Sequence, residues 1–244
     1  MSTKEIGMRH SERLWHLAYK YGMGSSFDGM WVEGLEVAEV AERLGGAVAG
    51  ECGWADLLKG VGEGTGVVWA GRLNGDWTQV VHLGVEALDV EPLSEGNRRA
   101  LRFGWHVNGV GDLVYAVDGA CVTVFGVTRP GGRRGREPQA LDPYAEGLRF
   151  DLQDSSWEND PDLPPGWREY SAWEEARLEG DLPDDAYDDM PPEWSDLLEL
   201  AVNGYSPPLA ACITSALTLV GRVTGRELDE AWMREIHTRF LFER

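Results

Sequence analysis

Two pairs of β-rich runs, each joined by a short glycine turn, constrain the fold of this 244-residue chain more than any other feature. The first pair runs from Val67 to Val81 around Asn74-Gly75, and the second runs from Leu113 to Phe125 around Asp118-Gly119. Both dipeptides suit type I′ turns, because the two central residues of that turn need positive φ angles. The stretch from Gly66 to Val127 therefore predicts antiparallel hairpins against which the remainder of the chain packs.

The segments on both sides of this stretch have helical spacing. Their apolar residues recur at intervals of three and four, as they do in helices with one buried face. We therefore expect an α+β protein with an antiparallel β-meander of about 4–5 strands, N-terminal helices and a C-terminal helical cover. The expected helices span residues 5–21, 35–44, 194–202, 208–220 and 229–240.

Negative charge is concentrated in one segment of the chain. The formal net charge is −20, and residues 151–199 hold 17 Asp and Glu against only Arg168 and Arg177. We therefore divide the chain into a core at residues 1–150, an acidic wrapping segment rich in Trp and Pro at 151–199, and C-terminal helices at 200–244. A field of this sign repels a phosphate backbone, so we expect no nucleic-acid partner.

The acidic segment also carries large aromatic side chains, which disordered acidic tails rarely do. Two interpretations follow. The tryptophans can dock the segment onto its own sheet while its carboxylates meet the arginine-rich loop at residues 129–136. Alternatively, tryptophans can anchor a partner protein while carboxylates steer a basic surface toward them. The tryptophans are Trp157, Trp167, Trp173 and Trp194, and the arginines are Arg129, Arg133, Arg134 and Arg136.

Candidate catalytic and metal-binding residues are few. His106 lies beside Trp105 in an expected strand and is the candidate for a general base, since histidine exchanges protons near neutral pH. The run at residues 184–189 could hold a hard cation, but it lacks the glycine and glutamate of an EF-hand loop. A solvated acidic face is therefore the expected reading, and we predict no metal and no cofactor. The three cysteines are far apart in sequence and are expected to be reduced: Cys52, Cys121 and Cys212.

Two further patterns exclude other classes of protein. The glycines between residues 60 and 66 match neither common phosphate-binding loop, and the segment enters a strand instead of leaving one, so we expect a linker. No apolar run approaches the roughly 20 residues of a membrane span or follows the N-terminus as in a signal peptide. We therefore expect a cytoplasmic protein without a membrane partner.

Four short phrases lie in a fixed order along the chain. They are Trp31-Val32-Glu33-Gly34-Leu35, Leu44-Gly45-Gly46, Tyr115-Ala116-Val117-Asp118-Gly119 and Val223-Thr224-Gly225. With the acidic, proline-bearing stretch between the last two, this order resembles an uncharacterised bacterial family, a domain of unknown function. The resemblance supplies no catalytic motif, and similarity to bacterial immunity proteins in size and acidity is an analogy only.

Binding is the function that these patterns favour. We predict a non-enzymatic bacterial interaction module, of the immunity or defence type, that captures a basic partner protein through its acidic segment. One alternative is an enzyme that uses a divalent metal or a histidine base. Another is an inhibitor that mimics nucleic acid by its charge. The expected partner-binding residues are Trp157, Trp167, Trp173, Asp184, Asp185, Asp188 and Asp189.

Overall fold

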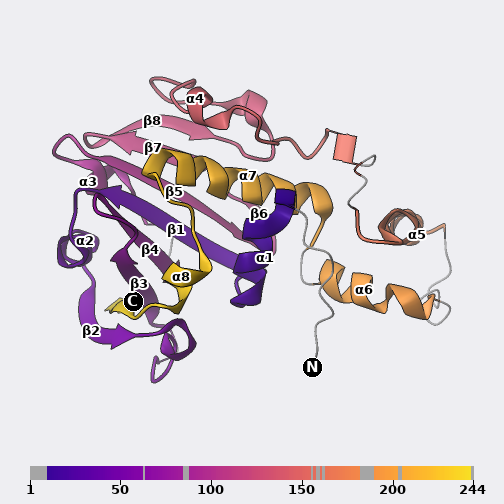
Figure 1. Cartoon of the computed structure of the whole chain (residues 1–244), viewed down its shortest axis with the longest axis horizontal. Coiled ribbons are helices and arrows are strands. Elements are labelled where there is room, and N and C mark those ends of the chain that lie inside the picture. The colour runs from indigo at the N-terminus through magenta and orange to yellow at the C-terminus, as the bar shows by residue number, and fades with distance from the viewer. Residues whose placement is uncertain are drawn as a thin grey trace.

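One antiparallel sheet of nine strands is the centre of the fold (Figure 1). The computed structural model describes residues 10–62, 64–84, 88–154, 156–157, 160, 163–181, 190–202 and 205–242. The strand order is β2-β9-β3-β4-β1-β5-β7-β8, and the short β6 pairs with β5. The strands are β1 (Ser26–Glu33), β2 (Ala47–Cys52), β3 (Gly66–Arg72), β4 (Trp77–Leu83), β5 (Arg99–His106), β6 (Gly109–Val110), β7 (Leu113–Val117), β8 (Ala120–Phe125) and β9 (His237–Phe242).

The prediction of a meander of 4–5 strands is wrong, although the fold combines helices and sheet as an α+β protein does. β1 lies between β4 and β5, and β5 pairs with β7, so β1 and β5 together join the two predicted hairpins. β9 lies between β2 and β3, so the last strand completes the other half of the sheet. Neighbours in this sheet are often far apart in sequence, which turn signals alone do not encode.

The helix predicted at residues 229–240 is also wrong in its second half. Helix α8 spans only Glu230–Arg234, and the chain then becomes β9. Phe240 pairs with Val48 on one side and with Val68 on the other, and its side chain is fully buried. Ladder hydrogen bonds to two strands together with this burial outweigh the helical spacing of the local apolar residues.

The two predicted turns have different geometries. Asp118 and Gly119 have φ angles of 51° and 74°, which confirms positive φ at both central positions. The Asn74 turn is not type I′, because neither Asn74 nor Gly75 has positive φ. The Asn74 side chain accepts hydrogen bonds from the backbone N–H groups of Asp76 and Trp77, each at 3.0 Å, so an Asx turn closes this longer loop.

Helices cover both faces of the sheet. On one face, called the α7 face, α7 packs over the strands with α1 beside it (Figure 1). On the opposite α2 face, α2 and α3 cover a smaller apolar cluster that includes Met30 and Phe240. Among the described residues, none of the helices combines the length and the apolar character that a membrane crossing requires. The α-helices are α1 (Arg13–Lys20), α2 (Val37–Leu44), α3 (Glu91–Ser94), α4 (Asp142–Ala145), α5 (Trp167–Glu179), α6 (Ser195–Val202), α7 (Pro207–Thr224) and α8 (Glu230–Arg234).

Candidate functional site

Helices α5 and α6 form a lobe that lies beside the sheet, beyond the start of α7 (Figure 1). We call these two helices with their flanking residues 163–166, 180–181 and 190–194 the acidic lobe. The α5 helix begins after Gly166, whose φ is 76°, and ends at Gly180, whose φ is 83°. At that end the N–H of Gly180 donates to carbonyl oxygens of the last turn, as in other helices that stop at a left-handed glycine.

Aromatic side chains attach the acidic lobe to the body of the protein. Trp167 of α5 is only 5% exposed and makes an edge contact with Tyr205, with ring centroids 5.2 Å apart. Tyr205 in turn lies 5.0 Å from the ring of Trp15 on α1. Its hydroxyl donates to the carboxylate of Glu12, which is 1% exposed and also lies 3.5 Å from His16. The buried carboxylate of Glu12 therefore has polar partners at the place where the acidic lobe meets the rest of the protein.

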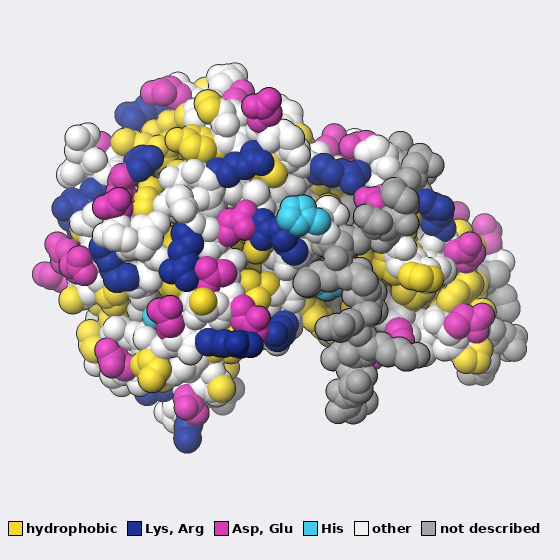
Figure 2. All heavy atoms as spheres, in the orientation of Figure 1, with side chains coloured by type: hydrophobic (Ala, Val, Ile, Leu, Met, Phe, Trp, Pro, Cys, Tyr) yellow, Lys and Arg dark blue, Asp and Glu magenta, His cyan; other side chains and the backbone are white. Residues whose placement is uncertain are grey.

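The carboxylates of the lobe point to solvent. Figure 2 shows Asp and Glu beside hydrophobic side chains and some basic side chains on this lobe, and over the sheet Lys and Arg are interspersed with Asp and Glu. Glu174 pairs with Arg177 at 2.8 Å. Other exposed carboxylates of the lobe have no ion pair with any residue that the structure describes, and these are Glu169, Glu175, Glu179, Asp181, Glu193 and Asp196.

The arginine-rich loop at residues 129–136 does not neutralise this surface. Arg133 pairs with Asp142, and Arg134 pairs with Asp112 at 2.9 Å. The Arg136 guanidinium lies 3.9 Å from the neighbouring Glu137. Three of the four loop arginines, Arg133, Arg134 and Arg136, therefore pair with carboxylates that lie outside the acidic lobe.

The structure gives the predicted partner-binding residues different surroundings. Trp157, Trp167 and Trp173 all pack against the buried cluster of the α7 face, so they help to hold the segment to its own protein. Trp167 is buried, whereas Trp157 and Trp173 are partly exposed. The other four predicted residues lie outside the described residues: Asp184, Asp185, Asp188 and Asp189.

His106 lies at the exposed end of β5. Its Nδ1 accepts a hydrogen bond from the backbone N–H of Asn108 at 3.1 Å, so the ring supports the tight turn into β6. No ion pair joins it to another described residue. This position suits a turn residue better than a general base, which needs an oriented partner and a sheltered substrate.

An ion cluster on the α2 face was missed by sequence reasoning. Asp28, His82 and Arg102 come from three adjacent strands, β1, β4 and β5. Asp28 Oδ1 lies 2.9 Å from His82 Nε2, and its Oδ2 accepts from Arg102 at 2.5 Å. Burial favours a higher pKa for Asp28, but hydrogen bonds and positive charge from the other two residues hold it below its usual value. His82 is only 3% exposed, and the cluster ties three adjacent strands together.

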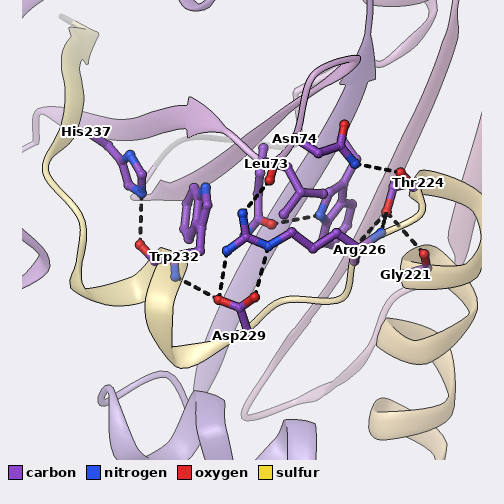
Figure 3. Close-up of polar contacts among 10 residues, drawn as sticks. Leu73, Asn74, Gly221, Thr224, Arg226, Asp229, Trp232 and His237 are labelled. Carbon is purple, nitrogen blue, oxygen red and sulfur yellow. Dashed lines mark hydrogen bonds and ion pairs between the residues drawn. The ribbon is translucent and has the colours of Figure 1, made fainter.

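A second polar network fastens the C-terminal segment to the first hairpin (Figure 3). Arg226 donates to both carboxylate oxygens of Asp229, at 2.9 and 3.0 Å, and to the carbonyl oxygen of Leu73 at 2.5 Å. Asn74 donates to the carbonyl oxygen of Thr224 at 2.8 Å. The hydrogen bonds of Arg226 and Asn74 thus join the segment after α7 to the first hairpin, which indicates a structural role for this network.

Neither thiol chemistry nor metal binding finds support in the described residues. Burial raises the pKa of the Cys212 thiol to about 11 and also raises the pKa values of Cys52 and Cys121, so thiolate is scarce at neutral pH. No group of three His, Cys, Asp or Glu residues within the described ranges could hold a metal ion.

Comparisons with protein-family models, curated proteins and solved structures give no match for this chain. The resemblance to a bacterial family therefore stays a prediction.

Proposed function

We propose that this protein is a non-enzymatic interaction module that binds a basic partner protein through the acidic lobe. One observation carries the proposal: six exposed carboxylates of the lobe have no ion pair with any described residue, while Glu33 and Asp28 of the sheet are each paired with an arginine. Uncompensated like charge on one surface raises the free energy of the folded protein. A basic partner relieves this repulsion and is steered toward the lobe by the same field.

The tryptophans and the carboxylates of the acidic segment have different roles, and this difference changes which residues we propose to contact the partner. Tryptophans were expected to anchor the partner, but Trp167 is buried against Tyr205 and fixes the lobe instead. The carboxylates face outward on α5 and around the start of α6. Long-range steering and salt-sensitive association thus belong to these carboxylates, because charges exposed to solvent act over a Debye length of ~8 Å at physiological ionic strength.

The test uses matched charge reversals. Glu175 and Glu179 are one turn apart on α5, and Glu42 and Glu51 are exposed carboxylates of the body. The double variants Glu175→Lys/Glu179→Lys and Glu42→Lys/Glu51→Lys change the net charge equally. The full-length protein is immobilised and used to capture proteins from cells that encode it, and the captured protein is then purified and titrated calorimetrically.

The expected partner is a basic protein that elutes as salt is raised. We expect the α5 variant to bind the partner roughly tenfold or more weakly. Each Glu→Lys substitution replaces an attraction between the lobe and a basic group of the partner by a repulsion, which changes the association free energy by about 0.5–1 kcal/mol. The body variant should retain the affinity of the wild type. Equal affinity of the wild type and the α5 variant, or affinity without salt dependence, would refute the proposal.

A further inference from the structure

The two edges of the sheet end differently. β8 forms one edge, and the chain after it returns along its outer side. Val124 exchanges two backbone hydrogen bonds with Arg134, at 2.8 and 3.1 Å, and the N–H of Glu137 donates to the carbonyl oxygen of Val122 at 2.9 Å. β2 forms the other edge, and among the described strands it pairs only with β9 (Figure 1). Within the described part of the chain, the backbone of residues 47–51 has no hydrogen bond outside that ladder.

The outer edge of β2 is accessible to another chain. An edge strand directs the N–H and C=O groups of alternate residues away from its one neighbour. Ala47, Val48, Gly50 and Glu51 are exposed, and Val48 has 62% of its surface accessible to solvent. An extended peptide can add a strand at such an edge, where backbone hydrogen bonds supply affinity and side chains supply specificity.

A β-bulge at Ala49 decides which side chains β2 presents together. Val48 lies opposite Phe240 and Glu51 lies opposite Thr238, so a step of three residues in β2 matches a step of two in β9. Directly opposite residues share a face of the sheet, and Phe240 belongs to the apolar cluster of the α2 face. Thr238 faces the same way, because it is two residues from Phe240 in one strand. Val48 and Glu51 therefore both lie on the α2 face, whereas a regular strand would place them on opposite faces.

Charge complementarity selects the kind of strand that fits this edge. Glu51 has no ion pair with any described residue, so a lysine or arginine on an added strand can pair with it. A second copy of this chain fits poorly. Residues 47–52 contain no basic side chain, and two chains that each carry a net charge of −20 repel one another.

We propose that β2 binds an extended segment of another protein as an added strand. A lysine or arginine of that segment lies beside Glu51, and an apolar residue covers Val48. This surface belongs to the body of the protein and lies outside the acidic lobe, so the inference does not rest on the proposed function. The sheet then continues beyond β2, and the backbone groups at its open edge are paired.

The first experiment separates strand addition from binding by side chains alone. The probe is an acetylated and amidated heptapeptide in which threonine alternates with lysine and valine. A peptide pairs with β2 through one of its two edges, and N-methylation of alternate residues removes the N–H donors of one edge. Two peptides, each methylated along a different edge, therefore keep the same side chains.

Binding to the full-length protein is followed by its backbone amide signals in NMR spectra. We expect the parent peptide and one methylated peptide to shift the signals of residues 47–52, and the other methylated peptide to bind at least tenfold more weakly. Equal affinity of all three peptides, no saturable binding of the parent, or shifts confined to β8 or the acidic lobe would overturn the proposal.

The second experiment tests the ion pair of Glu51 by exchanging charges. Glu51→Gln should bind the parent peptide about threefold more weakly, as expected for one cross-strand pair of opposite charge. Glu175→Gln, at an exposed carboxylate of the acidic lobe, is the matched control and should bind it as the wild type does. A peptide in which glutamate replaces lysine should bind Glu51→Lys more tightly than it binds the wild type. Equal affinities in both of these comparisons would contradict the assigned role of Glu51.

The two double variants distinguish this surface from the acidic lobe. Glu175→Lys/Glu179→Lys should keep its affinity for the peptide, whereas Glu42→Lys/Glu51→Lys should lose affinity for it. If the peptide binds at β2 and no basic partner is captured, the strand site stands and the proposed function is refuted. If a partner is captured and the peptide does not bind, the reverse holds. Slowed amide exchange at residues 47–52 that depends on protein concentration without peptide would assign the edge to a second copy and overturn the proposal.

Discussion

The imidazole of His237 stacks on the indole of Trp232, with ring centroids 4.2 Å apart and planes 29° apart. Its Nε2–H donates to the carbonyl oxygen of Trp232 at 2.9 Å, which fixes the ring at the junction of α8 and β9 (Figure 3). The edge of Trp69 lies against the same imidazole at 4.4 Å. Burial lowers the pKa of His237, because it favours the neutral form of the ring.

This burial predicts a pH dependence of stability. Unfolded histidine titrates near about 6.5, and the folded pKa of His237 is lower, so between the two values the unfolded chain binds the extra proton. The contribution of His237 is therefore complete above the unfolded pKa and is lost as pH falls toward the folded pKa. Urea unfolding of the wild type and His237→Gln at pH 7.5, 6.5 and 5.5 checks this difference. His106→Gln, at an exposed histidine, should retain the slope of the wild type; equal slopes in all three proteins would contradict the prediction.

Gly71 is predicted to tolerate no side chain. A Cβ at this position would lie 2.5 Å from Cε1 of the His237 ring, which Trp232 and Trp69 hold in place. We expect Gly71→Ala to reduce the free energy of unfolding by about 1–3 kcal/mol, as overpacking of a core does. Gly75→Ala is the control, because nothing lies within 4 Å of its Cβ and its φ is not positive. Thermal unfolding should separate the two variants, and coincident melting curves would show that the ring can move aside.

Asp229 is predicted to stabilise the C-terminal segment by two routes. It accepts from Arg226, and it caps α8 by accepting from the backbone N–H of Trp232 at 2.7 Å. Loss of the cap alone costs about 1 kcal/mol, and loss of the charged hydrogen bonds adds to this value. Denaturant unfolding of Asp229→Ala should show the larger effect, while Glu230→Ala removes only exposed pairs with Lys20 and Arg234 and should unfold nearly as the wild type.

A double-mutant cycle isolates the ion pair from the cap. Asp229→Ala and Arg226→Ala are measured separately and together, and their effects should be less than additive because both remove the same contact. Simple additivity of the two free-energy changes would show that Arg226 and Asp229 act independently.

Asp28 is predicted to matter more than an exposed acid with the same kind of partner. Asp28→Asn removes the charge that His82 and Arg102 share, and we expect a loss of roughly 2 kcal/mol in the free energy of unfolding. Asp112→Asn, at the exposed pair with Arg134, should cost at most about 1 kcal/mol. Because the folded pKa of Asp28 is lowered, its contribution is present above the unfolded pKa of about 4 and is lost as pH falls through the folded pKa. Equal losses in the two variants at pH 7, measured with urea, would count against the cluster.

Part of the candidate site follows from composition and part does not. The acidic segment is evident from the run of Asp and Glu at residues 151–199, but helix α5 is not, because only Trp167 and Tyr170 bury a face of it. Whether the carboxylates of the acidic segment pair with the arginine-rich loop also depends on contacts between residues that are far apart in sequence. Arg134 pairs with Asp112, a choice that the spacing of charges along the chain does not encode.

Features that depend on a few adjacent residues can be predicted from the sequence alone. Positive φ at Asp118 and Gly119, the end of α2 at Gly45 and the apolar face of α7 each follow from local sterics or from periodicity. Tertiary structure decided which strands are neighbours. Phe240 has helical spacing from Trp232, yet it lies in a strand between Val48 and Val68. Burial of Phe240 between strands that are nearly two hundred residues away in sequence stabilises the fold more than the local helical propensity would. Only the folded chain brings those strands together.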